Sequence, residues 1–190
     1  MESLLNNIAR YIQLEDDEKE YFLSLVGEKK VRRKQLLLQE GEVCHHSIFV
    51  KSGCLRGYTL DKNGDEHVIS FATAGWWIAD MYSLITRKPG QLFIESSTEA
   101  HLQLLTREHQ EKLFEQIPKF ERFFRILTEN SLVATQQRII DNLSLGARER
   151  YLEFIRKYPS LKDELPQKHI ASYIGVTPEF FSKMMRSLPE

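Results

Sequence analysis

Cysteine is scarce in this sequence, since only Cys44 and Cys54 occur and no C-x-x-C pair is present. Two thiols ten residues apart provide neither a disulfide framework nor the ligand spacing of a structural zinc site. We therefore expect two free thiols, no metal site and no cofactor.

Long hydrophobic runs are also lacking. No apolar stretch approaches the roughly 20 residues that a helix needs to cross a bilayer. Residues 1–7 carry an acidic and several polar side chains where a signal peptide requires positive charge followed by apolar residues. We expect a cytoplasmic protein that makes no membrane contact.

An excess of charge of one sign is missing as well. The formal net charge is −1; residues 120–190 carry 11 Lys and Arg against 9 Asp and Glu, and residues 1–119 carry 15 against 18. Proteins that bind nucleic acid usually show a basic face. The bias here is too weak to indicate such a partner by itself.

The sequence divides into three segments with different secondary-structure patterns. Residues 2–25 have the apolar spacing of two short helices. From about Val31 to Leu105, short β-rich runs alternate with turn residues, and Asp61-Lys62-Asn63-Gly64-Asp65 is a strong hairpin signal because Asn-Gly readily adopts positive φ. This pattern predicts an all-β domain that forms a barrel, sandwich or roll.

After Thr106 the pattern returns to helix. Pro118 is placed to start a long helix that carries many large apolar groups, and these need a second surface to cover them. That surface is either the β-domain or the same helix of a second subunit. Ser144 is a plausible N-cap for a further helix that ends near Pro159, and Lys162-Asp163-Glu164 looks like a polar linker.

The C-terminal segment 165–188 has the pattern of two short helices joined by a tight turn. Such helices cross steeply, so they need a small residue at the contact and a turn residue that tolerates positive φ. Ala171 and Gly175 meet these requirements, and Thr177 with Pro178 suits the start of the second helix. The positions expected on the shared inner face are Ile170, Ile174, Val176, Phe181 and Met184.

The outward positions of this helix-turn-helix suit nucleic acid. We predict that the helix from Pro178 to about Ser187 enters the major groove of DNA. Glu179 could accept a hydrogen bond from a cytosine amine, and Lys183 could donate to guanine. The predicted DNA-contacting residues are Gln167, Lys168, Thr177, Pro178, Glu179, Ser182, Lys183 and Arg186. Gln167, Lys168 and Thr177 are assigned to phosphates, and Arg186 either joins them or is a solvated surface side chain. The alternative is an αα-hairpin that only packs on the core.

Several motifs resemble the Crp/Fnr family of bacterial regulators over nearly the whole chain. They are Gly41-Glu42, residues 48–53 (IFVKSG), Asp61-x-x-Gly64 and residues 75–80 (GWWIAD). Residues 148–152 (RERYL), Tyr158-Pro159 and residues 165–167 (LPQ) resemble the branch common in Bacteroidetes-type bacteria. The resemblance implies a non-enzymatic transcription regulator. It would act as a homodimer on double-stranded DNA, in contact with RNA polymerase and under an unknown small-molecule effector.

The implied fold class is α+β. Residues 1–117 would form an N-terminal antiparallel β-roll (a double-stranded β-helix of the cyclic-nucleotide-binding type) with its N-terminal helices. Residues 118–143 would form a long dimerisation helix, and residues 144–190 an all-α helix-turn-helix domain that lacks most of the usual β-wing.

Two positions depart from the members of this family that bind cyclic nucleotides. Asp80 stands where those members carry a Glu, and Gly90-Gln91 stands where they carry the Arg-Ser pair that holds the phosphate. A buried phosphate without a cation is costly, so we predict that cyclic AMP does not bind. Residues that could line a pocket for another ligand are Trp77, Asp80, Met81, Tyr82, Gly90 and Gln91. Two isolated cysteines also cannot reproduce the cluster of the iron–sulfur members.

Two other functions fit parts of the sequence. A cupin-type metalloenzyme needs His-x-His on a strand, whereas His45 and His46 are adjacent and would point to opposite faces. A sensor module that acts through protein partners would use an apolar pocket, for haem or another small molecule, lined by Trp76, Trp77, Met81, Tyr82 and Phe93. Such residues are more often simply core.

Overall fold

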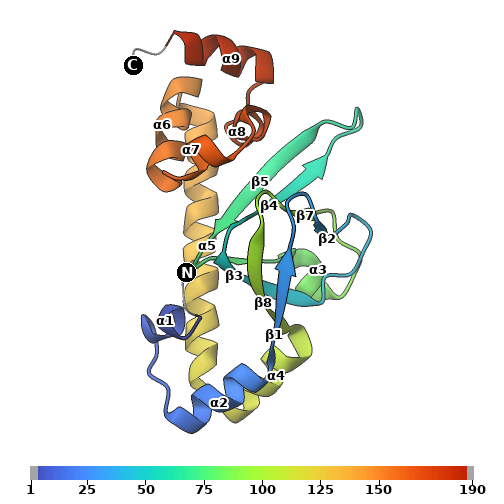
Figure 1. The fold of residues 1–190 in the computed structure, drawn as a ribbon, viewed down its shortest axis with the longest axis vertical. Helices are drawn as coiled ribbons and strands as arrows, with labels where there is room; N and C mark the ends of the chain where they lie inside the picture. The colour runs from blue at the N-terminus through green and yellow to red at the C-terminus, as the bar shows by residue number, and fades with distance from the viewer. Residues whose placement is uncertain (1–3, 188–190) are drawn as a thin grey trace.

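The computed structural model describes residues 4–187 as an α+β fold in which a β-roll lies beside one long helix (Figure 1). The helices are α1 (Leu4–Ala9), α2 (Asp16–Ser24), α3 (Met81–Thr86), α4 (Arg107–Gln116), α5 (Lys119–Ser144), α6 (Ala147–Lys157), α7 (Leu161–Glu164), α8 (Gln167–Tyr173) and α9 (Pro178–Arg186). The strands are β1 (Val26–Val31), β2 (Leu36–Leu38), β3 (His46–Ser52), β4 (Cys54–Leu60), β5 (Glu66–Thr73), β6 (Trp77–Ile78), β7 (Phe93–Ser96) and β8 (Ala100–Thr106).

The roll consists of two antiparallel sheets with the strand orders β1-β8-β3-β6 and β2-β7-β4-β5. Aliphatic side chains from both sheets share one buried core, which includes Val50, Leu55 and Ile94. Strands with alternating buried and exposed residues need a second sheet to cover their apolar faces, and here each sheet covers the other. The predicted α+β fold with an antiparallel roll is confirmed.

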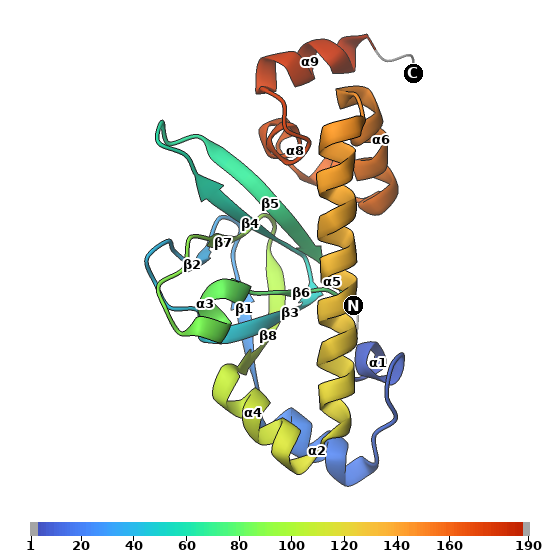
Figure 2. The same cartoon turned by 180° about the vertical axis from the view of Figure 1, so that it is seen from behind.

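β4 and β5 form the hairpin predicted around Asn63-Gly64. Gly64 has a φ of +84°, a conformation that favours glycine. Leu60 pairs with Glu66 next to the turn, and β5 lies at the edge of its sheet. In both views, β5 passes beside α8 of the C-terminal helices on its way from the hairpin turn to α5 (Figures 1 and 2).

The long helix α5 runs past the roll and joins the two ends of the molecule (Figure 1). Near its start, Phe120 and Phe123 are fully buried, and the Phe120 ring stacks on Phe22 of α2 with 4.9 Å between ring centroids. The N-terminal helices and the roll therefore cover the first part of α5. Farther along, five large apolar side chains are exposed: Leu132, Val133, Ile139, Ile140 and Leu143.

Three local predictions are wrong. Ser144 is the last residue of α5 rather than an N-cap; its hydroxyl donates to the Ile140 carbonyl, and Gly146 is the N-cap of the next helix. The predicted linker at residues 162–164 belongs to α7, because Leu161 anchors this turn in the core. The β-domain starts earlier than expected, with β1 at Val26, and it contains α3, so it is not purely β.

Candidate functional site

α8, a tight turn and α9 form the predicted helix-turn-helix. Ala171 is fully buried where the helices touch, and Gly175 has a φ of +72° in the turn. The Val176 N–H donates to the Ala171 carbonyl over 3.0 Å, which closes the turn. The Thr177 hydroxyl caps α9 by accepting from the Phe180 N–H over 3.2 Å, and Pro178 occupies the first turn. Each local requirement deduced from the sequence is met.

The inner face of the motif is apolar, as predicted. Ile170, Ile174 and Phe181 are buried, and the half-buried Val176 and Met184 pack against the same core. The Phe181 ring meets Tyr151 of α6 edge to face, with 5.4 Å between centroids. Because α6 supports α9 in this way, the outward side of α9 is held in a fixed orientation.

The outward side of α9 is open to solvent. Thr177, Pro178, Glu179, Lys183 and Arg186 are exposed, and Ser182 is half-buried. α9 lies at one extremity of the molecule, beyond α6 and α8 (Figures 1 and 2). Leu188, the last residue of the predicted motif, lies outside the described residues. The structure thus leaves the predicted base-contacting positions, Glu179 and Lys183, accessible from outside.

Phe180 is a surface residue that the sequence analysis did not select. Its side chain is 53% exposed on α9, between the outward Glu179 and the buried Phe181. Adjacent residues of a helix point in different directions, so the Phe180-Phe181 pair carried a signal that one ring lies inside and the other outside. An exposed aromatic ring at this position could make apolar contact with a thymine methyl group.

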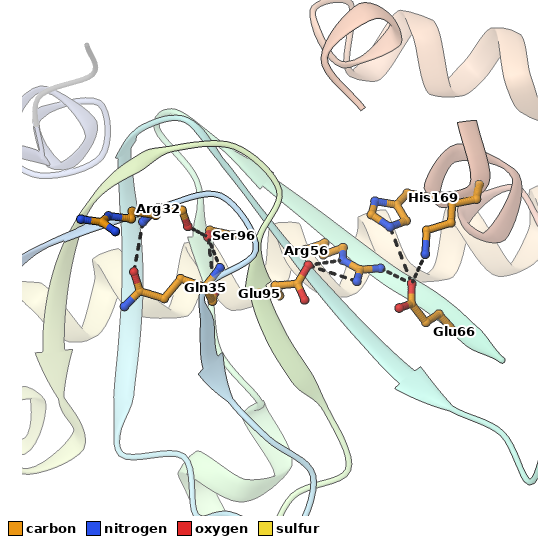
Figure 3. Close-up of polar contacts among 8 residues, drawn as sticks. Arg32, Gln35, Arg56, Glu66, Glu95, Ser96 and His169 are labelled. Atoms are coloured by element: carbon orange, nitrogen blue, oxygen red, sulfur yellow. Dashed lines mark hydrogen bonds and ion pairs between the residues drawn. The ribbon is translucent and has the colours of Figure 1, made fainter. Parts of the chain in front are cut away.

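The start of α8 is tied to the roll by an ion-pair network. Arg56 on β4 is buried between two carboxylates, with Nη1 2.6 Å from Glu66 Oε2 and Nη2 3.2 Å from Glu95 Oε1. On the side of α8, Lys168 Nζ lies 3.8 Å and His169 Nε2 3.6 Å from Glu66 Oε2. Figure 3 shows Glu66 between Arg56 of the roll and His169 of the helix-turn-helix. Of the predicted phosphate contacts, Gln167 is exposed, whereas Lys168 already faces a carboxylate.

The pKa values of Glu66 and His169 in this network are both lowered. The hydrogen bond from Arg56 lowers the pKa of Glu66 below its usual value. Burial, together with the nearby Arg56 charge, lowers the pKa of His169 to about 4. At neutral pH, therefore, Glu66 is charged and His169 is neutral.

The residues predicted to line a ligand pocket in the roll have different surroundings. Trp77 packs on α5, with its ring 5.6 Å from Phe124, while Met81 and Tyr82 are about half exposed on α3. Of the additional residues of the sensor hypothesis, Trp76 packs against Tyr158, and Phe93 stacks on Tyr58.

Asp80 is engaged within its own loop. Its buried carboxylate accepts backbone hydrogen bonds from Ser83 at 3.0 Å and from Gln91 and Leu92 at 3.2 Å each. Gly90 allows this approach, since a Cβ there would lie 2.3 Å from Asp80 Oδ2. Asp80 and the Gly90-Gln91 segment therefore meet, but through internal bonds that stabilise the start of α3.

Cys44 and Cys54 are both buried free thiols. In residues 4–187, no three His, Cys, Asp or Glu side chains lie close enough together to hold a metal ion. Over the same residues, every helix is too short or too polar to cross a membrane.

Comparisons with known proteins find relatives of the roll and of most of the chain. Residues 28–117 match the family model of the cyclic nucleotide-binding domain. The anaerobic regulatory protein of Haemophilus influenzae is 21% identical over 184 residues, covering 90% of this chain and 71% of that protein. The fumarate and nitrate reduction regulatory protein of Vibrio cholerae is likewise 21% identical, covering 90% and 73%.

Solved structures share the fold. FixK2 from Bradyrhizobium japonicum superposes with a TM-score of 0.75 at 19% identity, covering 86% of this chain and 84% of that one. A protein of the Crp/Fnr family from Eubacterium rectale superposes with a TM-score of 0.73 at 18% identity, covering 91% and 82%. The superposed part covers 86% and 91% of this chain, which is more than the roll alone, so the likeness includes α5 and the C-terminal helices.

Proposed function

We propose that this chain is a transcription regulator of the Crp/Fnr family and that it binds a specific DNA site through α9; the matched domain, the curated relatives and the shared fold support this proposal. The observation that carries the proposal is the exposed outer side of a well-formed helix-turn-helix at one end of the molecule. The proposed function is binding rather than catalysis. Membership of the branch common in Bacteroidetes-type bacteria stays a prediction.

α9 would insert into the major groove with its N-terminal half toward the bases. Glu179 and Lys183, one helical turn apart on the exposed face, are the proposed base-reading residues, and Phe180 would add apolar contact. Four further residues would contact the DNA backbone or neighbouring bases: Thr177, Pro178, Ser182 and Arg186. Gln167 and Lys168 would reach phosphates from α8, and Lys168 would then exchange Glu66 for a phosphate.

A homodimer through α5 is supported by the uncovered part of this helix. Leu132, Gln136, Ile139 and Leu143 follow one another at alternating spacings of four, three and four residues, which is the spacing of a coiled-coil seam. Leu143 is 85% exposed in the single chain. Pairing two such helices would cover this stripe and set two α9 helices in two-fold symmetry, so half-sites roughly one helical turn of DNA apart are expected.

The proposed effector is a small molecule other than cyclic AMP. The Asp80 carboxylate is used internally, and the buried guanidinium of Arg56 is already paired with Glu66 and Glu95. A cyclic nucleotide phosphate would therefore meet no unpaired buried cation at these positions. We further expect the regulator to act in the cytoplasm, where it would meet DNA and RNA polymerase.

Genome-wide mapping of the sites bound by the full-length protein tests this proposal. The expected result is a set of sites that share one two-fold-symmetric motif. Binding that shows no sequence preference, or a preference unchanged by substitutions in α9, would contradict it.

A further inference from the structure

A cavity of about 220 Å³ lies where α5, α6 and α8 meet. Phe154, Tyr173 and Ile174 give it an apolar wall, and the α5 and α6 residues that line the rest include four basic side chains and two acidic ones. The α5 residues that face it, such as Arg138 and Asp141, lie on the side of the helix opposite the stripe of Leu132, Ile139 and Leu143. Dimerisation through that stripe would leave the cavity uncovered.

Three basic side chains of the cavity have no carboxylate within ion-pair distance in the described part of the chain. Arg138 donates to the carbonyls of Val68, Ile69 and Tyr173, and its buried Nε finds no acceptor among residues 4–187. Arg150 likewise donates to backbone carbonyls, and the Lys157 ammonium lies over the Trp76 ring, 5.4 Å from its centroid.

The acidic side chains of the cavity do not balance these charges. Glu153 is paired with Arg156. Asp141, which accepts a hydrogen bond from the neutral Gln137 amide over 2.8 Å, therefore supplies one negative charge against the three positive charges of Arg138, Arg150 and Lys157. Desolvation lowers the pKa of Arg138, and desolvation together with the Arg138 charge lowers the pKa of Lys157. A guanidinium removed from water without a counter-charge is unfavourable. The cavity therefore presents positive charge that an anion would neutralise.

We propose that this cavity binds a small organic anion, with a phosphate or carboxylate group at Arg138 and Lys157 and an apolar body against Phe154. Such a ligand would contact α5, α6 and α8 together. The ligand would regulate DNA binding only if α9 binds DNA, so this part of the inference rests on the proposed function. Fixing α8 relative to α5 would then also fix the position of α9. Anion binding itself does not depend on that function.

The full-length protein titrated with phenyl phosphate, benzoate, inorganic phosphate and neutral phenol tests the inference. Calorimetry gives the affinities, and tryptophan fluorescence reports on the site because the ring of Trp76, one of the two tryptophans, lies under Lys157. We expect saturable binding of phenyl phosphate or benzoate, with phenol and inorganic phosphate weaker by at least about tenfold, or roughly 1.4 kcal/mol. Which of the two anions binds more tightly identifies the preferred head group.

Matched variants localise the site. K157Q should weaken anion binding by at least about tenfold, or roughly 1.4 kcal/mol, and K157R should retain it. R148Q, at an exposed position of the same helix outside the cavity, should bind like the wild type. Equal affinity for phenol and the anions, no saturable binding at millimolar concentration, or equal affinity in K157Q and wild type would overturn the inference. If DNA binding is intact in the same preparation, such a failure leaves the proposed function standing.

Discussion

The hydroxyl of Ser172 on α8 donates a hydrogen bond to the carbonyl of Glu66 on β5 over 2.6 Å. The same hydroxyl accepts from the Val68 N–H over 2.8 Å. β5 is the outer strand of its sheet, so these backbone groups would otherwise form part of an open edge. The Ser172 side chain thus covers part of the edge of the roll. A shift of the β4–β5 hairpin would therefore move α8 or break these two hydrogen bonds.

Ser172→Ala is expected to loosen this junction. It leaves a donor and an acceptor of β5 without their partner, so the free energy of unfolding should fall by about 1–2 kcal/mol. Hydrogen exchange at the Val68 amide should become faster. Ser144→Ala serves as the control, because its hydroxyl bonds only within the exposed end of α5. Unchanged exchange at Val68 would show that the contact does not hold the junction.

Stability is expected to fall between about pH 6.5 and pH 4. The pKa of His169 is about 4 in the folded chain against an ordinary 6.5, so the unfolded chain takes up the proton first as the pH drops. The contribution of neutral His169 to the free energy of unfolding is therefore fully present above pH 6.5 and is lost as the pH falls toward 4. The contribution of Glu66, whose pKa Arg56 lowers, is present above the ordinary value of 4.5 and is lost as the pH falls below it.

Urea unfolding across this pH range measures the effect. His169→Gln should flatten the decline between pH 6.5 and 4, whereas His45→Gln, at an exposed position, should leave it as in the wild type. An unaltered pH profile in His169→Gln would rule out this histidine as the source.

Lys183→Ala is expected to weaken specific DNA binding by about 1–3 kcal/mol and to relax the preference at one base position. The physical reason is the loss of a donor to a base edge from the exposed face of α9. Fluorescence anisotropy with a mapped site and its single-base variants measures both effects. Lys112→Ala, at an exposed position of α4, removes the same charge far from α9 and should bind normally. Unchanged affinity in Lys183→Ala would count against the base-reading assignment.

Leu143→Asp is expected to weaken dimerisation at least about 100-fold, or roughly 2.7 kcal/mol. The substitution places a charge in the apolar stripe that two α5 helices would bury together. Analytical ultracentrifugation gives the dissociation constant. Leu152→Asp, at another exposed leucine on α6, is the matched control. A stable dimer in Leu143→Asp would place the subunit interface elsewhere.

Cyclic AMP is expected to show no binding by calorimetry at micromolar concentration. Asp80 is saturated by backbone donors, and Arg87, the nearby cation of the same loop, pairs with Glu111 of α4 at 3.4 Å. Heat of binding that saturates in the micromolar range would disprove the prediction and would require Asp80 or Arg56 to change partners.

The helix-turn-helix was predictable from the sequence because its determinants are local. Ala171, Gly175 and Thr177 act within one turn of the residues they serve, and the Gly64 hairpin is set by its own φ. Ser144 was misassigned as an N-cap because capping depends on where the preceding helix ends, whereas Phe180 was omitted although the Phe180-Phe181 pair carried a local signal. The exposed stripe of α5 was anticipated only as one of two alternatives.

Periodicity and turn chemistry in the sequence thus determined which segments are helix and strand, and which face of α9 is polar. Only the tertiary structure decided that the Asp80 carboxylate accepts hydrogen bonds from Gln91 and Leu92, that Trp77 packs on α5, and that Arg138 faces a cavity in which no carboxylate lies within ion-pair distance of it. The reason is physical: local geometry depends on neighbouring residues, whereas the partners of a buried charge or ring come from segments that only the folded packing brings together.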